Sequence, residues 1–258
     1  MGQRVFLYID ILGFADIAKD DAAVLAIFER IDQLNVHKDG SFRVIAFSDT
    51  ILVYGDGYWL EHPEKAVMWL IEFAEDLFFR LIGIDRHFRA YICRGGFDDI
   101  EMKNIRAFYG TALVTSYRKE RDIGAMGIFI ENELAALCHI YETTAFDRDC
   151  HFVFVVRRIG EINYPAREYP LHPLLVENSG FQIGYEIAYL RNLVASMGDP
   201  SLPSRVRAKY ALTWSIYQKQ FPHVCAFLLA NGFDPSGLSK YDLAADVAKV
   251  GTEDGFFG

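Results

Sequence analysis

The amino-acid sequence predicts an α/β core that is followed by a helical C-terminal extension. Two observations predict the core: β-rich runs alternate with helix-like segments up to residue 158, and the segment 64–81 among them is clearly amphipathic. The proline-bearing stretch 159–173 then separates this core from segments that all have a helical pattern. We therefore expect two parts, residues 1–158 and residues 159–258.

The individual elements follow from local patterns. Helix 64–81 is expected because its apolar residues recur at i, i+3, i+4 and i+7. A hairpin is expected where two β-rich runs are separated only by Ser48-Asp49. Strands are predicted at 4–9, 43–47, 50–54, 87–93 (ended by Gly95-Gly96), 127–130 and 151–156. Helices are predicted at 15–19 with 22–31, 64–81, 110–121, 131–140, 181–197, 204–221, 223–230 and 238–250.

The composition excludes several classes of protein. Of 258 residues, 52% are hydrophobic, which is enough to bury a core and argues against intrinsic disorder. The net charge of −9 argues against a general nucleic-acid-binding protein, which is usually basic. No signal peptide and no uninterrupted apolar span are evident, so we expect a cytoplasmic protein without a membrane partner. Four scattered cysteines without a CxxC pair indicate neither a disulfide framework nor a zinc site: Cys93, Cys138, Cys150 and Cys225.

Two aspartates stand at positions where chemistry is expected. Asp10 ends the first predicted strand, and Asp49 lies at the tip of the predicted hairpin. If these strands are neighbours, both carboxylates reach the same end of one sheet, where their oxygens suit hard divalent cations. Two such ions can clamp a triphosphate and activate an attacking hydroxyl. From spacing alone, a helix-capping role for Asp10 and a turn role for Asp49 remain open alternatives.

Four local strings occur in a fixed order along the core. They are Asp10–Phe14 (DILGF), Phe47–Val53 (FSDTILV), Phe88–Gly96 (FRAYICRGG) and Tyr109–Glu120 (YGTALVTSYRKE). Together they resemble the catalytic domain of class III nucleotidyl cyclases, and most of all the bacterial anti-phage pyrimidine cyclases of the Pycsar systems. The resemblance covers roughly residues 4–158. It implies a mixed, mostly antiparallel sheet flanked by helices, with a helical C-terminal extension beyond it.

The resemblance also implies roles for individual residues. Asp10, Asp49 and the backbone carbonyl of Ile11 would bind two divalent ions, Mn²⁺ or Mg²⁺, and Arg118 would stabilise the pentavalent phosphorus as the ribose 3′-hydroxyl attacks the α-phosphate. The family acts as homodimers with shared active sites, so a second copy is an expected partner. Contacts with the substrate are expected from Arg94, Arg43, Thr111 and Phe14.

Departures from the family pattern bear on the substrate. Val114 stands where purine cyclases carry an asparagine, and Ile45 and Thr111 stand where adenylate cyclases read adenine. This favours a pyrimidine, with UTP and a cUMP product preferred to CTP and cCMP. By the same resemblance, the product would be an infection signal that activates a separately encoded effector.

Two other functions fit the same residues. A cyclase-like nucleotide sensor or interaction module without catalysis is compatible with Val114. A palm-like nucleotidyltransferase would use the same pair of acids to join two nucleotides. A P-loop NTPase is not supported, because the sequence has no GxxxxGK[ST] string.

Overall fold

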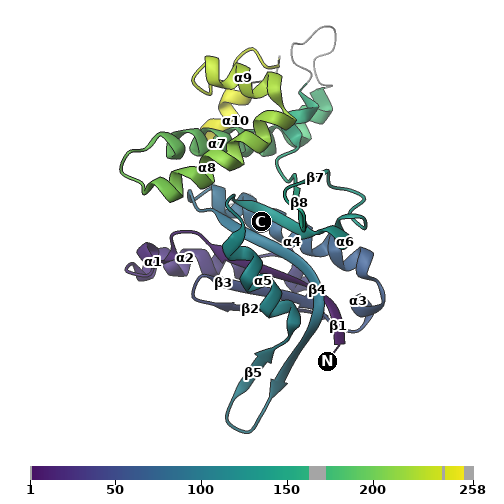
Figure 1. The fold of residues 1–258 in the computed structure, drawn as a ribbon. Helices are drawn as coiled ribbons and strands as arrows, with labels where there is room; N and C mark the ends of the chain where they lie inside the picture. The colour runs from purple at the N-terminus through teal and green to yellow at the C-terminus, as the bar shows by residue number, and fades with distance from the viewer. Residues whose placement is uncertain (1, 163–172, 240–241, 253–258) are drawn as a thin grey trace. The chain divides into compact units, whose positions relative to one another are not determined.

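The computed structural model describes residues 2–162, 173–239 and 242–252 of the chain (Figure 1). These residues fall into two compact units. One contains Met1–Phe78 with His87–Val155, and the other contains Phe79–Arg86 with Val156–Gly258. None of the described helices is both long and apolar enough to cross a membrane.

The first unit is built on an eight-stranded sheet with the order β2-β3-β1-β4-β6-β8-β7, and β5 pairs only with β4. The pairings are antiparallel except for the parallel contact between β4 and β6. The strands are β1 (Gly2–Ile11), β2 (Phe42–Phe47), β3 (Thr50–Gly55), β4 (Phe88–Glu101), β5 (Arg106–Tyr109), β6 (Gly127–Glu131), β7 (Thr143–Ala145) and β8 (Cys150–Val153). The predicted fold class is confirmed: the sheet is mixed and mostly antiparallel, helices flank it, and further helices follow in the chain.

Helices cover both faces of this sheet. The helices of the unit are α1 (Phe14–Ile17), α2 (Asp21–Asp32), the 3₁₀ turn η1 (Asn35–Lys38), α3 (Tyr58–Glu61), α4 (Pro63–Ile82, whose last turn belongs to the second unit), α5 (Thr111–Asp122) and α6 (Asn132–Ala135). Phe88 of β4 packs against Phe78 of α4, with ring centroids 6.4 Å apart. Cys93 of the same strand contacts Ser116 of α5 at 3.2 Å. Because side chains alternate along a strand, α4 and α5 lie on opposite faces, and α5 runs along β4 in Figure 1.

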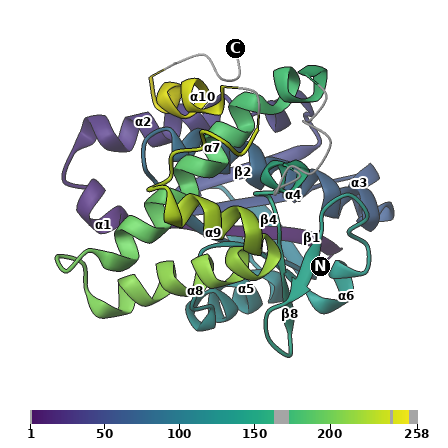
Figure 2. The ribbon, with the colours of Figure 1, turned by 90° about the horizontal axis from the view of Figure 1, so that it is seen from above.

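The second unit is helical. It contains η2 (Arg158–Glu161), α7 (Pro173–Gly198), α8 (Ser204–Gln220), α9 (Pro222–Ala230) and α10 (Leu243–Lys249). Helix α7 packs against α8 and α10 (Figure 2). The fully buried carboxylate of Glu186 accepts hydrogen bonds from the backbone N–H groups of Arg157, Arg158 and Ile159 at 2.7–3.0 Å. This carboxylate fixes the start of the unit to α7, since three donors would otherwise lack a partner.

The glycines that were expected to end the strand at 87–93 lie inside it, because β4 continues to Glu101. Gly95 serves close packing instead. A Cβ atom on Gly95 would lie 2.8 Å from the backbone nitrogen of Ala112, so glycine lets α5 approach β4. The short strands β5 and β7 are not predicted by the sequence, and the helix expected at 131–140 is only the single turn α6. In the helical unit, α10 is shorter than expected, α7 begins earlier, and residues 163–172 of the connector lie outside the described residues.

Replacement of Gly95 by alanine should loosen α5 from the sheet. The added Cβ would overlap the Ala112 backbone, and we expect Gly95→Ala to lower the free energy of unfolding by about 1–3 kcal/mol. Gly40→Ala is the matched control, because a Cβ there meets no atom within 4 Å and should change stability by less than about 0.5 kcal/mol. Urea unfolding of the three proteins measures both values. Equal stability of the two variants would contradict the close packing of α5.

Candidate functional site

The ends of β1 and β3 bring the two predicted acids together. Asp10 is paired in register with Thr50, the residue that follows Asp49. The backbone N–H of Ile11 donates a hydrogen bond of 2.8 Å to the carbonyl oxygen of Asp49. Ser48 adopts a φ of +53°, a left-handed value that allows the two-residue turn formed by Ser48 and Asp49. The pairing therefore fixes both aspartates at one end of the sheet, and the side chain of Asp10 remains 20% exposed.

Asp10 lies on the face of the sheet that α5 covers. It is directly opposite Arg89 of β4, and opposed residues of an antiparallel pair project on the same side. Tyr8 shares this face, and its hydroxyl lies 3.3 Å from the hydroxyl oxygen of Thr50. Burial raises the pKa of Tyr8, the hydrogen bond to Thr50 opposes this, and the charges of Asp10 and Asp49 raise it further. The tyrosine is therefore a neutral hydrogen-bonding group beside the acids.

Arg89 is a charged member of this site that the sequence did not single out. Its side chain is only 6% exposed, and its guanidinium contacts the carboxylates of both Asp10 (3.3 Å) and Glu120 of α5. A third bond of 2.6 Å reaches the carbonyl oxygen of Ile123. Burial lowers the pKa of Arg89, and the charge of Asp10 opposes that shift. The sequence carries a signal for this role, because Arg89 stands within the apolar string FRAYIC. An arginine that is buried together with such a strand needs charged or polar partners.

Arg118 lies on the exposed face of α5. The buried face of this helix contains Ser116 and Glu120, and Arg118, between them in sequence, projects in the opposite direction. Val114 is one turn earlier on the same exposed face. The structure therefore does not direct Arg118 toward the acids of its own chain.

Two of the expected substrate contacts have structural roles. Phe14 is buried and packs against Phe28 of α2, with ring centroids 6.5 Å apart. The hydroxyl oxygen of Thr111 accepts a hydrogen bond of 2.9 Å from the backbone N–H of Gly96, which fixes the start of α5 on β4. Both side chains therefore support the fold around the acid pair.

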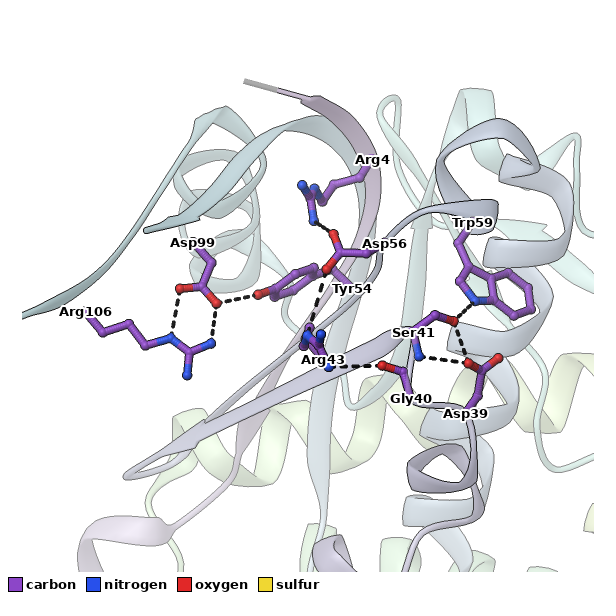
Figure 3. A network of polar contacts seen from close by, with 10 residues as sticks. All are labelled: Arg4, Asp39, Gly40, Ser41, Arg43, Tyr54, Asp56, Trp59, Asp99 and Arg106. Atoms are coloured by element: carbon purple, nitrogen blue, oxygen red, sulfur yellow. Dashed lines mark hydrogen bonds and ion pairs between the residues drawn. The ribbon is translucent and has the colours of Figure 1, made fainter. Parts of the chain in front are cut away.

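Arg43 and Arg94 lie away from the acids along their strands. Arg43 pairs with Tyr54, four residues from Thr50 in β3, which is roughly 13 Å. Its guanidinium donates to the carbonyl oxygen of Gly40 at 3.0 Å and belongs to the polar network drawn in Figure 3. Arg94 is in the middle of β4, five residues from the partner of Asp10, or roughly 17 Å. Within one chain, the structure brings neither arginine to the acids.

The donor atoms at the ends of β1 and β3 fit a divalent cation that is shared with a phosphate. Among the described residues, no group of three or more His, Cys, Asp or Glu side chains could hold a metal ion. The available donors are the carboxylates of Asp10 and Asp49 and the carbonyl of Ile11, all of them oxygens. Mg²⁺ commonly binds one or two carboxylates together with substrate phosphates, so this donor set suits it and Mn²⁺.

Loss of the Arg118 side chain should leave the fold intact. The residue is exposed, and we expect Arg118→Ala to change the free energy of unfolding by less than about 0.5 kcal/mol. Chemical denaturation followed by circular dichroism measures this change. A loss of more than about 1 kcal/mol would show that the guanidinium supports the fold and is not free for a ligand.

Comparisons with known proteins gave matches to solved structures only, since no family model and no curated protein matches the chain. The adenylyl cyclase CyaB from P. aeruginosa aligns over 59% of this chain and 93% of its own, with 12% identity and a TM-score of 0.44. The guanylyl cyclase Cya2 aligns over 59% and 93%, with 14% identity and a TM-score of 0.41. The guanylate cyclase domain of RhGC from Catenaria anguillulae, solved with GTP, aligns over 59% and 96%, with 12% identity and a TM-score of 0.44. Identity and TM-score are low in each case, so these matches assign no function to the chain.

Proposed function

We propose that this chain is a nucleotidyl cyclase that converts a pyrimidine nucleoside triphosphate, UTP in preference to CTP, into a 3′,5′-cyclic mononucleotide and pyrophosphate. One observation carries the proposal: the pairing of β1 with β3 brings Asp10 and Asp49 to the same end of the sheet. The order of the DxxGF, hairpin and YG…RxE strings along the chain supports the same assignment.

The residues of the chain have distinct tasks in this reaction. Asp10, Asp49 and the carbonyl of Ile11 would hold two Mg²⁺ or Mn²⁺ ions. Such ions, when bound, neutralise the triphosphate and make a hydroxyl a better nucleophile. The ribose 3′-oxygen bonds to the α-phosphorus, its proton passes to solvent, and the bond from that phosphorus to the bridging oxygen breaks as pyrophosphate leaves. The planar guanidinium of Arg118 donates to the phosphate oxygens as negative charge grows on them.

The preference for a pyrimidine rests on what the hairpin and α5 lack. Ile45 of β2 offers no polar group to a base, and the hydroxyl oxygen of Thr111 already accepts the N–H of Gly96. These two side chains therefore offer a purine at most the Thr111 hydroxyl, and unpaired polar groups on a buried base are costly. UTP is preferred to CTP on the resemblance to Pycsar cyclases alone.

The outward direction of Arg118 supports a homodimer with shared active sites. Because this side chain points away from its own sheet, it can approach a nucleotide held by the acids of a second copy. Exposed apolar side chains on α5 and on the β4–β5 ribbon support such an interface. They are 41–60% exposed and comprise Ile100, Met102, Ile105, Tyr109, Val114 and Tyr117.

The cyclic product would act as an intracellular alarm during phage infection. This part of the proposal rests on the resemblance to Pycsar cyclases and on a separately encoded effector that binds the product. It assigns no contact on this chain to the effector.

A nucleotide sensor without catalysis is the second candidate function. Val114 favours it, because an apolar side chain on the exposed face of α5 replaces the asparagine of purine cyclases. A sensor would bind the triphosphate and release no pyrophosphate, so product analysis separates the two functions.

Product analysis with four nucleotides tests the proposed reaction. The wild-type protein is incubated with ATP, GTP, CTP or UTP and Mn²⁺, and we expect mass spectrometry to find cUMP formed fastest. Asp10→Asn and Asp49→Asn should each lose more than about nine-tenths of the rate, or over roughly 1.4 kcal/mol, because each removes an ionic ligand. Asp16→Asn, at an exposed position of α1, is the matched control and should keep full activity. Faster formation of cAMP or cGMP would refute the pyrimidine preference, and a dinucleotide product would favour a nucleotidyltransferase.

Mixing two inactive variants tests the shared site. Arg118→Ala should lower the rate about 10²–10³-fold, the usual effect of losing one preorganised donor. Co-expression with Asp49→Asn at equal levels should restore about a quarter of wild-type activity, since half of the dimers are mixed and each has one intact site. Co-expression of Asp10→Asn with Asp49→Asn is the control and should restore nothing, because both acids of a site come from one chain and each site of a mixed dimer then carries one lesion. No recovery from exchanging, well-folded Arg118→Ala and Asp49→Asn would place each active site within one chain.

A further inference from the structure

Three charged groups from different elements meet at Asp10, one member of the acid pair. The buried guanidinium of Arg89, from β4, contacts Asp10 of β1 and Glu120 of α5. Glu120 is itself buried, with 6% of its surface exposed. Two carboxylates therefore share one guanidinium, and the trio retains a negative charge.

The guanidinium of Arg89 is shared among several partners. One of its nitrogens lies 3.3 Å from the carboxylate of Asp10 and also contacts Glu120. Another donates a hydrogen bond of 2.6 Å to the carbonyl oxygen of Ile123, the residue that follows α5. Asp10 is therefore one of three groups that share this guanidinium.

This arrangement matters for the charge of Asp10. A buried arginine paired with Asp10 alone would neutralise the carboxylate and repel an approaching cation. Glu120 supplies the compensating negative charge at the same guanidinium. The Asp10 carboxylate, whose side chain is 20% exposed, then keeps its negative charge.

We propose that Glu120 is a positioning residue that shares Arg89 with Asp10 and thereby preserves the negative charge of Asp10 for a divalent cation. The inference rests on the proposed function, because it takes Asp10 as a metal ligand. It adds that the metal affinity of the acid pair depends on α5, the helix that also carries Arg118 two residues before Glu120.

Binding of Mn²⁺ in the absence of nucleotide tests the proposal without use of activity. The electron paramagnetic resonance signal of free Mn²⁺ is titrated with the full-length wild-type protein, Glu120→Gln, Asp122→Asn and Asp10→Asn. We expect Glu120→Gln to weaken binding about tenfold, because Arg89 is then balanced by Asp10 alone. Asp122→Asn removes the same charge from an exposed position of the same helix and should leave binding within about twofold, since exposed charges are screened.

A double variant separates a charge effect from damage to the fold. In Arg89→Met/Glu120→Met the whole ion pair is replaced by apolar side chains, an exchange that buried pairs often tolerate. Mn²⁺ affinity should return to within about threefold of the wild type, and circular dichroism verifies that each protein is folded. If Glu120→Gln is too unstable to titrate, the double variant decides the question by itself: an affinity tenfold below wild type would overturn the proposal.

The remaining outcomes are distinct. Wild-type affinity in Glu120→Gln, or an equal loss in Asp122→Asn, would overturn the role of Glu120 while leaving the acid pair as a metal site. Equal Mn²⁺ binding by the wild type and Asp10→Asn would overturn the metal site itself and the inference with it.

Discussion

The pairing of β1 on both of its edges is the constraint on which the site depends. β3 fixes one edge of β1 so that Asp10 lies beside Thr50 and the turn at Asp49, and β4 fixes the other so that Asp10 lies opposite Arg89. A slip of one residue in either register would turn the side chain of Asp10 to the opposite face of the sheet. The buried residues of β1 resist such a slip, because side chains of different size on its two packed faces would have to exchange places.

The close approach of α5 to β4 is the second requirement, and it joins packing to electrostatics. Gly95 allows the approach, Thr111 fixes the start of the helix, and Glu120 meets Arg89 near its end. The same docking turns Arg118 outward, away from its own sheet. Because α5 is held this closely, it places the charge of Glu120 inside the unit that contains the sheet and presents the charge of Arg118 on the surface of that unit.

The sequence predicted the elements whose patterns are local. The hairpin around Ser48-Asp49 and the amphipathic helix at 64–81 are formed as expected, because turn spacing and helical periodicity need no distant partner. Arg89 escaped attention as a site residue, since its importance arises from pairing between strands that are far apart in the chain. Gly95-Gly96 was interpreted as a strand end, because close packing against a later helix has no local signal. Substrate roles for Arg43 and Arg94 were expected from their positions beside the hairpin and before Gly95-Gly96, and the strand registers place both away from the acids.

The central claim is that the ends of β1 and β3 hold divalent cations for a nucleotide. Anomalous diffraction from crystals grown with Mn²⁺ and a non-hydrolysable UTP analogue tests it most directly. The account predicts manganese ions at bonding distance from the carboxylates of Asp10 and Asp49, with the triphosphate bound to the same ions. It also predicts that Arg118 of a second copy contacts the α-phosphate. Manganese bound elsewhere, with Asp10 still in contact with Arg89 and no nucleotide beside it, would contradict the account.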